Sequence, residues 1–92
     1  MPVAFLYDTP EGTKERYDAI RAKLGVDENN LPQGGLLHFA GPSPNGGWRV
    51  VEVWESAEDQ QRFGETLGPV LAEAGITRGA PQTWQVHHMM KA

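Results

Sequence analysis

The chain has 92 residues, of which 39% are hydrophobic and 22% charged, and this length predicts one domain with one modest core over residues 1–92. A net charge of −4 excludes the basic stripe that nucleic-acid binding requires, and no stretch is long enough to cross a membrane. The absence of cysteine excludes disulfides, thiolate catalysis and Cys-type zinc sites, and together with the lack of a basic, apolar leader it favours a cytoplasmic protein.

The first half of the chain predicts a strand, a helix and a second strand. Pro2–Tyr7 is apolar at almost every position, which is typical of a central strand. Thr13 is a suitable N-cap for a helix that runs through Leu24, with Gly25 in the position of a C-terminal glycine. One apolar stripe of this helix contains Tyr17, Ile20 and Leu24. The polar loop of residues 26–35 then leads into the second strand, Leu36–Ala40.

A hairpin loop with two prolines and an Asn-Gly pair joins the second strand to a third. Because proline cannot donate a hydrogen bond, we expect pairing to fray before the turn, at Pro42 and Pro44. The third strand begins at Trp48 and carries apolar residues on both faces, so we expect cover on both sides. One face holds Trp48, Val50, Glu52 and Trp54, and the other holds Arg49, Val51, Val53 and Glu55.

Ser56, followed by Asp59, predicts the N-cap of a second helix directly after the third strand. Its buried stripe contains Phe63, Leu67, Val70, Leu71 and Ala74. Gly68-Pro69 predicts a kink or a division into two short helices, ending at Gly75. Gln82–Met89 is the predicted last strand.

The predicted order βαββαβ is the ferredoxin-like α+β arrangement, with a four-stranded antiparallel sheet. Its helices can cover only one face of that sheet. Both faces are apolar: strand one presents Val3, Phe5 and Tyr7 on one side and Ala4 and Leu6 on the other, and strand two presents Leu36 and Ala40 on one side and Leu37 and Phe39 on the other. An uncovered apolar face of this extent indicates an interaction surface. The simplest cover is a second copy related by a two-fold axis, so we expect a homodimer.

Several segments together resemble the antibiotic-biosynthesis-monooxygenase-like proteins of the dimeric α+β barrel superfamily. They are Tyr17…Leu24-Gly25, Gly35-Leu36-Leu37-His38, Val51 to Ser56, Phe63 and Leu67-Gly68-Pro69. The resemblance spans nearly the whole chain and implies the dimeric α+β barrel fold. That superfamily includes cofactor-independent quinol-forming monooxygenases, haem-degrading enzymes, polyketide cyclases, isomerases and small proteins without known activity.

The resemblance implies a role in the pocket for one residue of this chain, whereas the chain lacks two residue patterns that members of the family have at their sites. Trp54 matches a strand tryptophan that lines the pocket between sheet and helices in several members. Some monooxygenases have an Asn four residues before it, where this chain has Val50. The haem-degrading members carry an Asn on strand one and a His on the second helix, and neither is present here.

His38 is the candidate general base, because it interrupts an otherwise apolar strand and imidazole titrates near neutral pH. The alternative is a partly buried histidine that is hydrogen-bonded to a neighbour for structural reasons. Glu52 is its candidate partner across the strands, although a slip of one residue in the hairpin would place Glu52 on the opposite face. His87 and His88 point to opposite faces of the last strand, so at most one of them can share a site with His38.

The residues predicted to line the pocket are mostly aromatic, and the histidines of the sequence do not have the spacing of metal ligands. Its predicted substrate-binding residues are Trp54, Tyr7, Phe63, Tyr17 and His87, and core packing is the alternative role for the aromatic ones. No helical i, i+4 pair of histidines supports a metal site.

We therefore predict a small dimeric enzyme that oxidises, cyclises or isomerises an aromatic metabolite without metal or organic cofactor. His38 would be the base, Trp54 and Phe63 the walls, and the helix at Gly68-Pro69 a flexible lid. The alternatives are a non-catalytic ligand-binding or structural dimeric domain and, third, a protein that binds haem through a strand histidine.

Overall fold

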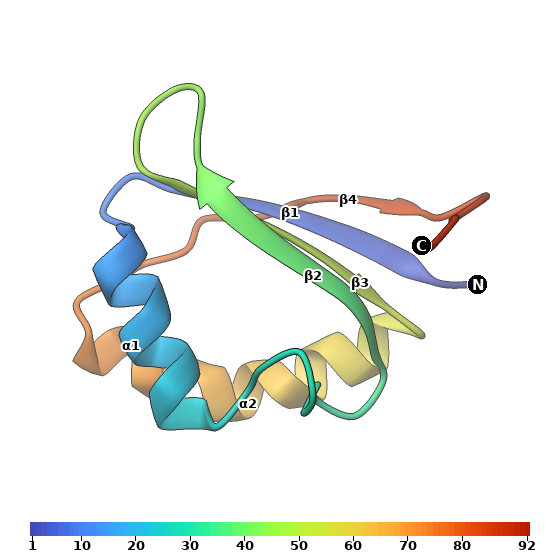
Figure 1. The fold of residues 1–92 in the computed structure, drawn as a ribbon, viewed down its shortest axis with the longest axis horizontal. Coiled ribbons are helices and arrows are strands. Elements are labelled where there is room, and N and C mark those ends of the chain that lie inside the picture. Colours follow the sequence, from blue (N-terminus) through green and yellow to red (C-terminus); the bar gives the residue numbers. More distant parts are fainter.

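The structure, a computed structural model, describes residues 1–92 as one sheet and two helices (Figure 1). The strand order is β2-β3-β1-β4 and each neighbouring pair is antiparallel. This confirms the ferredoxin-like α+β fold, with β1 in a central position. The elements are β1 (Val3–Thr9), α1 (Lys14–Leu24), β2 (Gly35–Pro42), β3 (Trp48–Trp54), α2 (Ala57–Glu73) and β4 (Gln82–Gln85).

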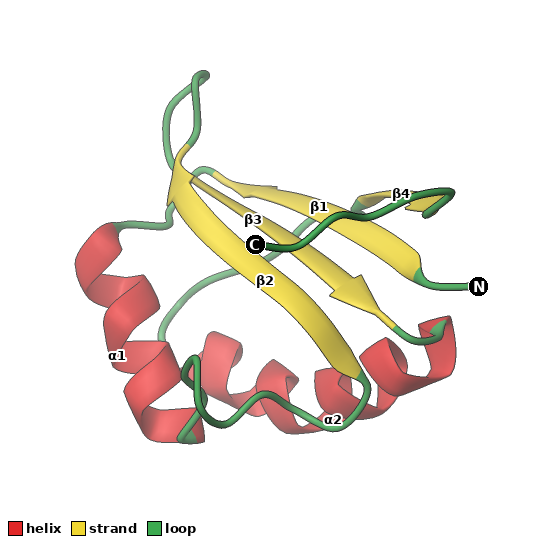
Figure 2. Cartoon of the chain, turned by 45° about the vertical axis from the view of Figure 1, so that its right-hand side comes forward, coloured by secondary structure: helices red, strands yellow, loops and turns green.

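The two helices lie on the same side of the sheet, which gives a molecule of two layers (Figure 2). Neither helix has the length and apolar character needed to span a bilayer. Helix α1 begins as expected, since the Thr13 side chain accepts a hydrogen bond from the Arg16 amide at 3.1 Å. It ends at Gly25, whose φ of 70° is in the left-handed region that glycine favours.

Helix α2 is continuous from Ala57 to Glu73 although Pro69 lies inside it, so of the two expected alternatives, a kink or a division, the division into two short helices does not occur. The cap is as expected: Ser56 Oγ accepts a hydrogen bond from the Asp59 amide at 3.1 Å. An interior proline costs about 3 kcal/mol, whereas burying one leucine side chain contributes about 1.5–3 kcal/mol. Leu67 is buried, and apolar side chains of the stripe follow Pro69, so packing on both sides of the proline offsets its cost.

The β2–β3 hairpin stays paired up to its turn, contrary to the fraying expected from its prolines. Pro42 is the partner of Trp48, and the Ser43 amide then donates to the Gly47 carbonyl at 3.1 Å. Inward-pointing amides alternate along an antiparallel strand, so the one at Ser43 means that the nitrogen of Pro42 faces away from β3. The edge strand therefore loses no ladder bond at the proline.

Strand β4 is shorter than expected, ending at Gln85 instead of Met89. The Val86 amide makes one further bond, to the Pro2 carbonyl at 2.9 Å, just outside β1. His87 and His88 lie beyond the sheet and are exposed.

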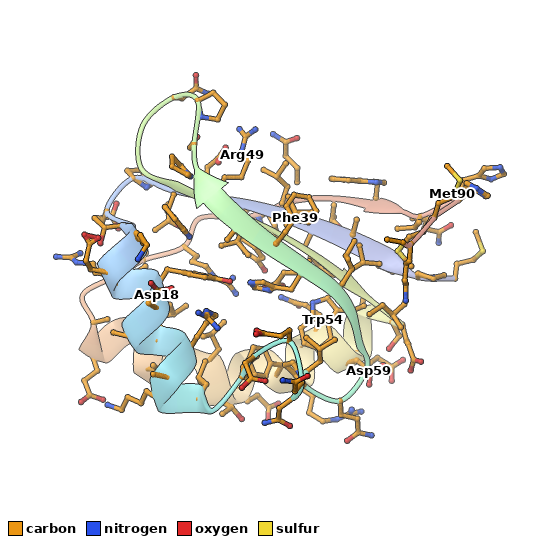
Figure 3. All side chains as sticks on the ribbon, in the orientation of Figure 1. Asp18, Phe39, Arg49, Trp54, Asp59 and Met90 are labelled. Atoms are coloured by element: carbon orange, nitrogen blue, oxygen red, sulfur yellow. The ribbon has the colours of Figure 1, made fainter.

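The sheet has an inner face against the helices and an outer face without helices. On the inner face, Phe5, Tyr7 and Trp54 form the core cluster, with Phe63 packed against it. Figure 3 labels Trp54 between the sheet and α2, and Phe39 on the other side of the sheet. The outer face is apolar: Leu6, Phe39, Val51 and Trp84 share it by register.

Candidate functional site

A cavity of about 100 Å³ lies between the inner face of the sheet and the two helices. Its walls are almost entirely apolar. They include Tyr17 and Ile20 from α1, Trp48 and Trp54 from β3, and Phe63 and Leu67 from α2. The apolar stripes predicted for both helices therefore face a space that they only partly fill.

His38 and Glu52 are direct partners across β2 and β3, so the register that the sequence left open places both on the inner face. His38 Nε2 lies 2.6 Å from the Tyr17 hydroxyl, and His38 Nδ1 lies 3.9 Å from Glu52 Oε2. The histidine side chain is 31% exposed, so it lies where the cavity reaches the surface. These partners favour the tautomer with hydrogen on Nδ1 and a lone pair on Nε2 that accepts from Tyr17.

Burial favours the neutral forms of His38 and Tyr17. Burial lowers the pKa of His38; the Glu52 carboxylate opposes this shift, while Arg21 and Arg78 add to it. Burial also raises the pKa of the Tyr17 phenol. At neutral pH the site therefore holds a neutral imidazole with an intact phenol donating to it.

Glu52 is a buried carboxylate, with its side chain only 5% exposed. One oxygen, Oε1, accepts from the Trp54 indole nitrogen at 3.1 Å. The other, Oε2, lies 3.6 Å from Arg78 Nη1 and 3.9 Å from His38 Nδ1. Both contacts are ion-pair contacts just beyond hydrogen-bonding distance.

Arg78 is a site residue that sequence reasoning missed. It lies in the loop between α2 and β4, its side chain is 15% exposed, and its guanidinium carbon is 3.6 Å from the centre of the Tyr7 ring. Nothing local in the loop indicates this position. The only signal was indirect, because the Glu52 carboxylate on a covered strand requires a counter-ion.

The structure brings together most of the predicted site. The residues His38, Glu52, Trp54, Phe63 and Tyr17 all line the cavity.

Two predicted substrate-binding residues do not line it. Tyr7 lies behind Arg78, where it accepts a hydrogen bond from Gln60 at 2.8 Å and burial raises its pKa. His87 is exposed beyond β4, which ends at Gln85, and it does not line the cavity. Histidine, aspartate and glutamate side chains nowhere form a group of three that could hold a metal ion.

The sequence matches no protein-family model and no curated protein. Solved structures do match over nearly the whole chain. A candidate antibiotic biosynthesis monooxygenase from Chloroflexus aurantiacus J-10-fl is 16% identical with a TM-score of 0.67, covering 99% of this chain and 98% of that one. SnoaB, a cofactor-independent oxygenase from Streptomyces nogalater, is similar in a mutant form, with 10% identity, a TM-score of 0.67, and coverage of 99% and 98%.

A third solved structure, a candidate antibiotic biosynthesis monooxygenase from Deinococcus radiodurans, is 9% identical with a TM-score of 0.56 and coverage of 100% and 98%. The chain thus has the fold of antibiotic-biosynthesis-monooxygenase-like proteins, as its sequence resemblance implied. At these identities the likeness concerns the fold.

Proposed function

We propose that the cavity is the active site of a cofactor-independent enzyme that removes a proton from a small planar metabolite. One observation carries this proposal: a neutral histidine, flanked by a phenol and a buried carboxylate, faces a cavity that is otherwise apolar. A base of this kind works best when its pKa lies near the working pH and water is excluded around it. The fold shared with SnoaB, a cofactor-independent oxygenase, is consistent with this chemistry.

The proton would move to His38 Nε2, the nitrogen with the lone pair. Tyr17 occupies that lone pair at 2.6 Å, so a substrate either displaces the phenol or loses its proton to the phenol oxygen while Tyr17 gives its own to His38. Glu52, on the Nδ1 side of the ring, would stabilise the imidazolium that forms. The electron pair left on the substrate then reduces molecular oxygen in an oxygenase, or takes a proton back elsewhere in an isomerase or cyclase.

The cavity volume limits the substrate to about one ring. An engineered cavity of about 150 Å³ in another protein holds one benzene, and pockets for drug-sized ligands have about 300–1,000 Å³. A cavity of about 100 Å³ is smaller than either. A polycyclic substrate would require the helices to move outward, whereas a single ring requires little more than side-chain adjustment.

Hydrogen–deuterium exchange tests the proton-removal step without knowledge of the later product. Single-ring phenols and enolisable ketones would be incubated with the protein in D₂O, without oxygen, and deuterium uptake at carbon followed by mass spectrometry. We expect faster uptake for at least one compound class, and a loss of about 10²–10⁴-fold in His38→Ala, the range of general base catalysis. Oxygen uptake with the same compounds in air then separates an oxygenase from an isomerase or cyclase.

A matched control is Arg16→Gln, which changes an arginine of α1 that does not line the cavity. Equal exchange in wild type and His38→Ala would refute the proposed base. Saturable binding without exchange by any compound would favour the alternative, a non-catalytic ligand-binding domain.

We further propose that the outer face of the sheet pairs with a second copy of the chain. Phe39 is 56% exposed and Trp84 is 48% exposed, and both lie on the face that no helix covers. A bidentate ion pair, Arg49 with Asp8 at 2.8 and 2.9 Å, lies at one end of this apolar surface. An apolar centre with a charged rim is the anatomy of a protein interface.

A further inference from the structure

We infer that the cavity recognises a single-ring carboxylate, whose negative end is bound by Arg21 and Trp48. The inference rests on the proposed function only in treating the cavity as a ligand site. It assigns a charge and a binding end to the ligand, which the proton-removal step does not require.

Two buried donors at the cavity have no hydrogen-bond partner. They are Arg21 Nε and Trp48 Nε1, and both side chains line the cavity. A buried donor without a partner costs about 1–3 kcal/mol, so each such group calls for a missing acceptor. The Trp54 indole provides the contrast, because its nitrogen donates to Glu52.

These two donors belong to the same end of the cavity because both side chains contact one ring. The Arg21 guanidinium carbon lies 5.3 Å from the centre of the Tyr17 ring, and the Trp48 ring centre lies 5.5 Å from it. The Tyr17 ring is thus the common neighbour of both side chains, and it is beside this ring that the inference places the ligand oxygens. Arg78, by contrast, is engaged with Glu52 and with the face of Tyr7.

Arg21 is the cation at this end whose carboxylate partner is not buried. Glu52 and Arg78 balance one another, and His38 is neutral. Arg21 pairs with Asp18 at 3.3 Å, but Asp18 also pairs with Lys14 at 3.2 Å. Asp18 is 43% exposed and shared between these two cations, so water and Lys14 weaken its neutralisation of Arg21.

A carboxylate supplies what this end lacks. It has two acceptor oxygens for two unpaired donors and a negative charge that the Arg21 guanidinium can pair with. The apolar walls accept a ring behind it with the same side-chain adjustment that a single-ring substrate requires. The planar acid would lie with its carboxylate at Arg21 and its ring toward Trp54 and Phe63.

Binding of benzoate and of benzyl alcohol to the intact protein separates recognition of the charge from recognition of the ring. Isothermal titration calorimetry would measure both dissociation constants under the same conditions. We expect benzoate to bind at least about tenfold more tightly than benzyl alcohol, which corresponds to about 1.4 kcal/mol. In Arg21→Gln we expect the benzoate affinity to fall about tenfold while that of benzyl alcohol stays unchanged.

Two further variants complete the design. Trp48→Phe keeps an aromatic ring but removes the indole donor, and it should weaken benzoate binding severalfold with little effect on the alcohol. Arg16→Gln removes a positive charge of α1 that lies outside the cavity and should change neither constant. If Arg21→Gln fails to fold, Trp48→Phe still decides the question.

Equal affinity for the two ligands, or an equal loss of benzoate binding in Arg16→Gln and Arg21→Gln, would overturn the inference. The proposed function fails by a different result. If benzoate binds through Arg21 but no compound exchanges deuterium, the carboxylate site stands without the chemistry. If the alcohol binds as well as benzoate and exchange depends on His38, the chemistry stands without the carboxylate site.

Discussion

Replacing Arg78 with methionine should strongly destabilise the protein, because it leaves the Glu52 carboxylate buried without its counter-ion. The two groups lie 3.6 Å apart, with side chains 15% and 5% exposed. Their direct attraction is about 4–5 kcal/mol at an effective dielectric constant of about 20, and removing one partner of a buried pair costs about 3–5 kcal/mol. Since Arg78 keeps some contact with water, we expect about 3 kcal/mol, a large part of the stability of a small domain.

A double-mutant cycle separates this pairing from the packing of the arginine on Tyr7. Glu52→Gln retains an acceptor for the Trp54 indole but removes the charge. The double variant should therefore lose less stability than Arg78→Met alone, with a coupling energy of about 2 kcal/mol. Urea unfolding followed by tryptophan fluorescence, at one fixed protein concentration, measures all four proteins.

The control is Arg62→Met, which breaks a pair with Asp59 in which the arginine side chain is 57% exposed. Exposed pairs contribute about 0–1 kcal/mol, so this loss should be small. If Arg78→Met costs no more than Arg62→Met, or if the cycle is additive within about 0.5 kcal/mol, the reasoning about a buried charge network is refuted.

Three further outcomes follow. Burial lowers the pKa of His38 below its unfolded value of about 6.5, so the protein should lose stability as the pH drops below that value. Urea midpoints measured across this pH range should therefore decline less in His38→Gln than in the wild type, and an equal decline would contradict this. Gly34→Ala should lower the stability by about 3 kcal/mol, since φ at this glycine is 84° and a Cβ would overlap Asp59. Gly25→Ala, where φ is also positive but the Cβ would meet open space, should lower it by about 1 kcal/mol, and equal losses of stability in calorimetry would contradict the overlap. Phe39→Glu should convert dimer to monomer in sedimentation velocity, and a wild type that is already monomeric at micromolar concentration would rule out the dimer.

Sequence periodicity was sufficient to predict the order of the elements and the faces of β3. The alternation from Trp48 to Trp54 assigned each side chain to its observed face, because successive side chains of a strand point to opposite faces of the sheet. The helix caps at Thr13 and Ser56 were equally readable, since a local hydrogen bond defines each. Such features depend on neighbours in the chain.

The pairing of His38 with Glu52 depended on something that composition does not reveal. Pro42 was expected to end the ladder, but its nitrogen faces away from β3 and the register is kept. Arg78 was missed because its role arises from tertiary contacts with Glu52 and Tyr7, from a loop without local pattern. The cavity volume is likewise a result of packing between layers.

The indole N–H signals in a ¹H–¹⁵N spectrum test the ligand cavity most directly, because the three tryptophans report on different places. Trp48 and Trp54 line the cavity, while Trp84 lies on the outer face and is 48% exposed. Titration with single-ring aromatic compounds should shift the signals of Trp48 and Trp54 in a saturable way and leave that of Trp84 in place. A panel that moves only the Trp84 signal, or none of the three, would contradict a ligand site between the sheet and the helices.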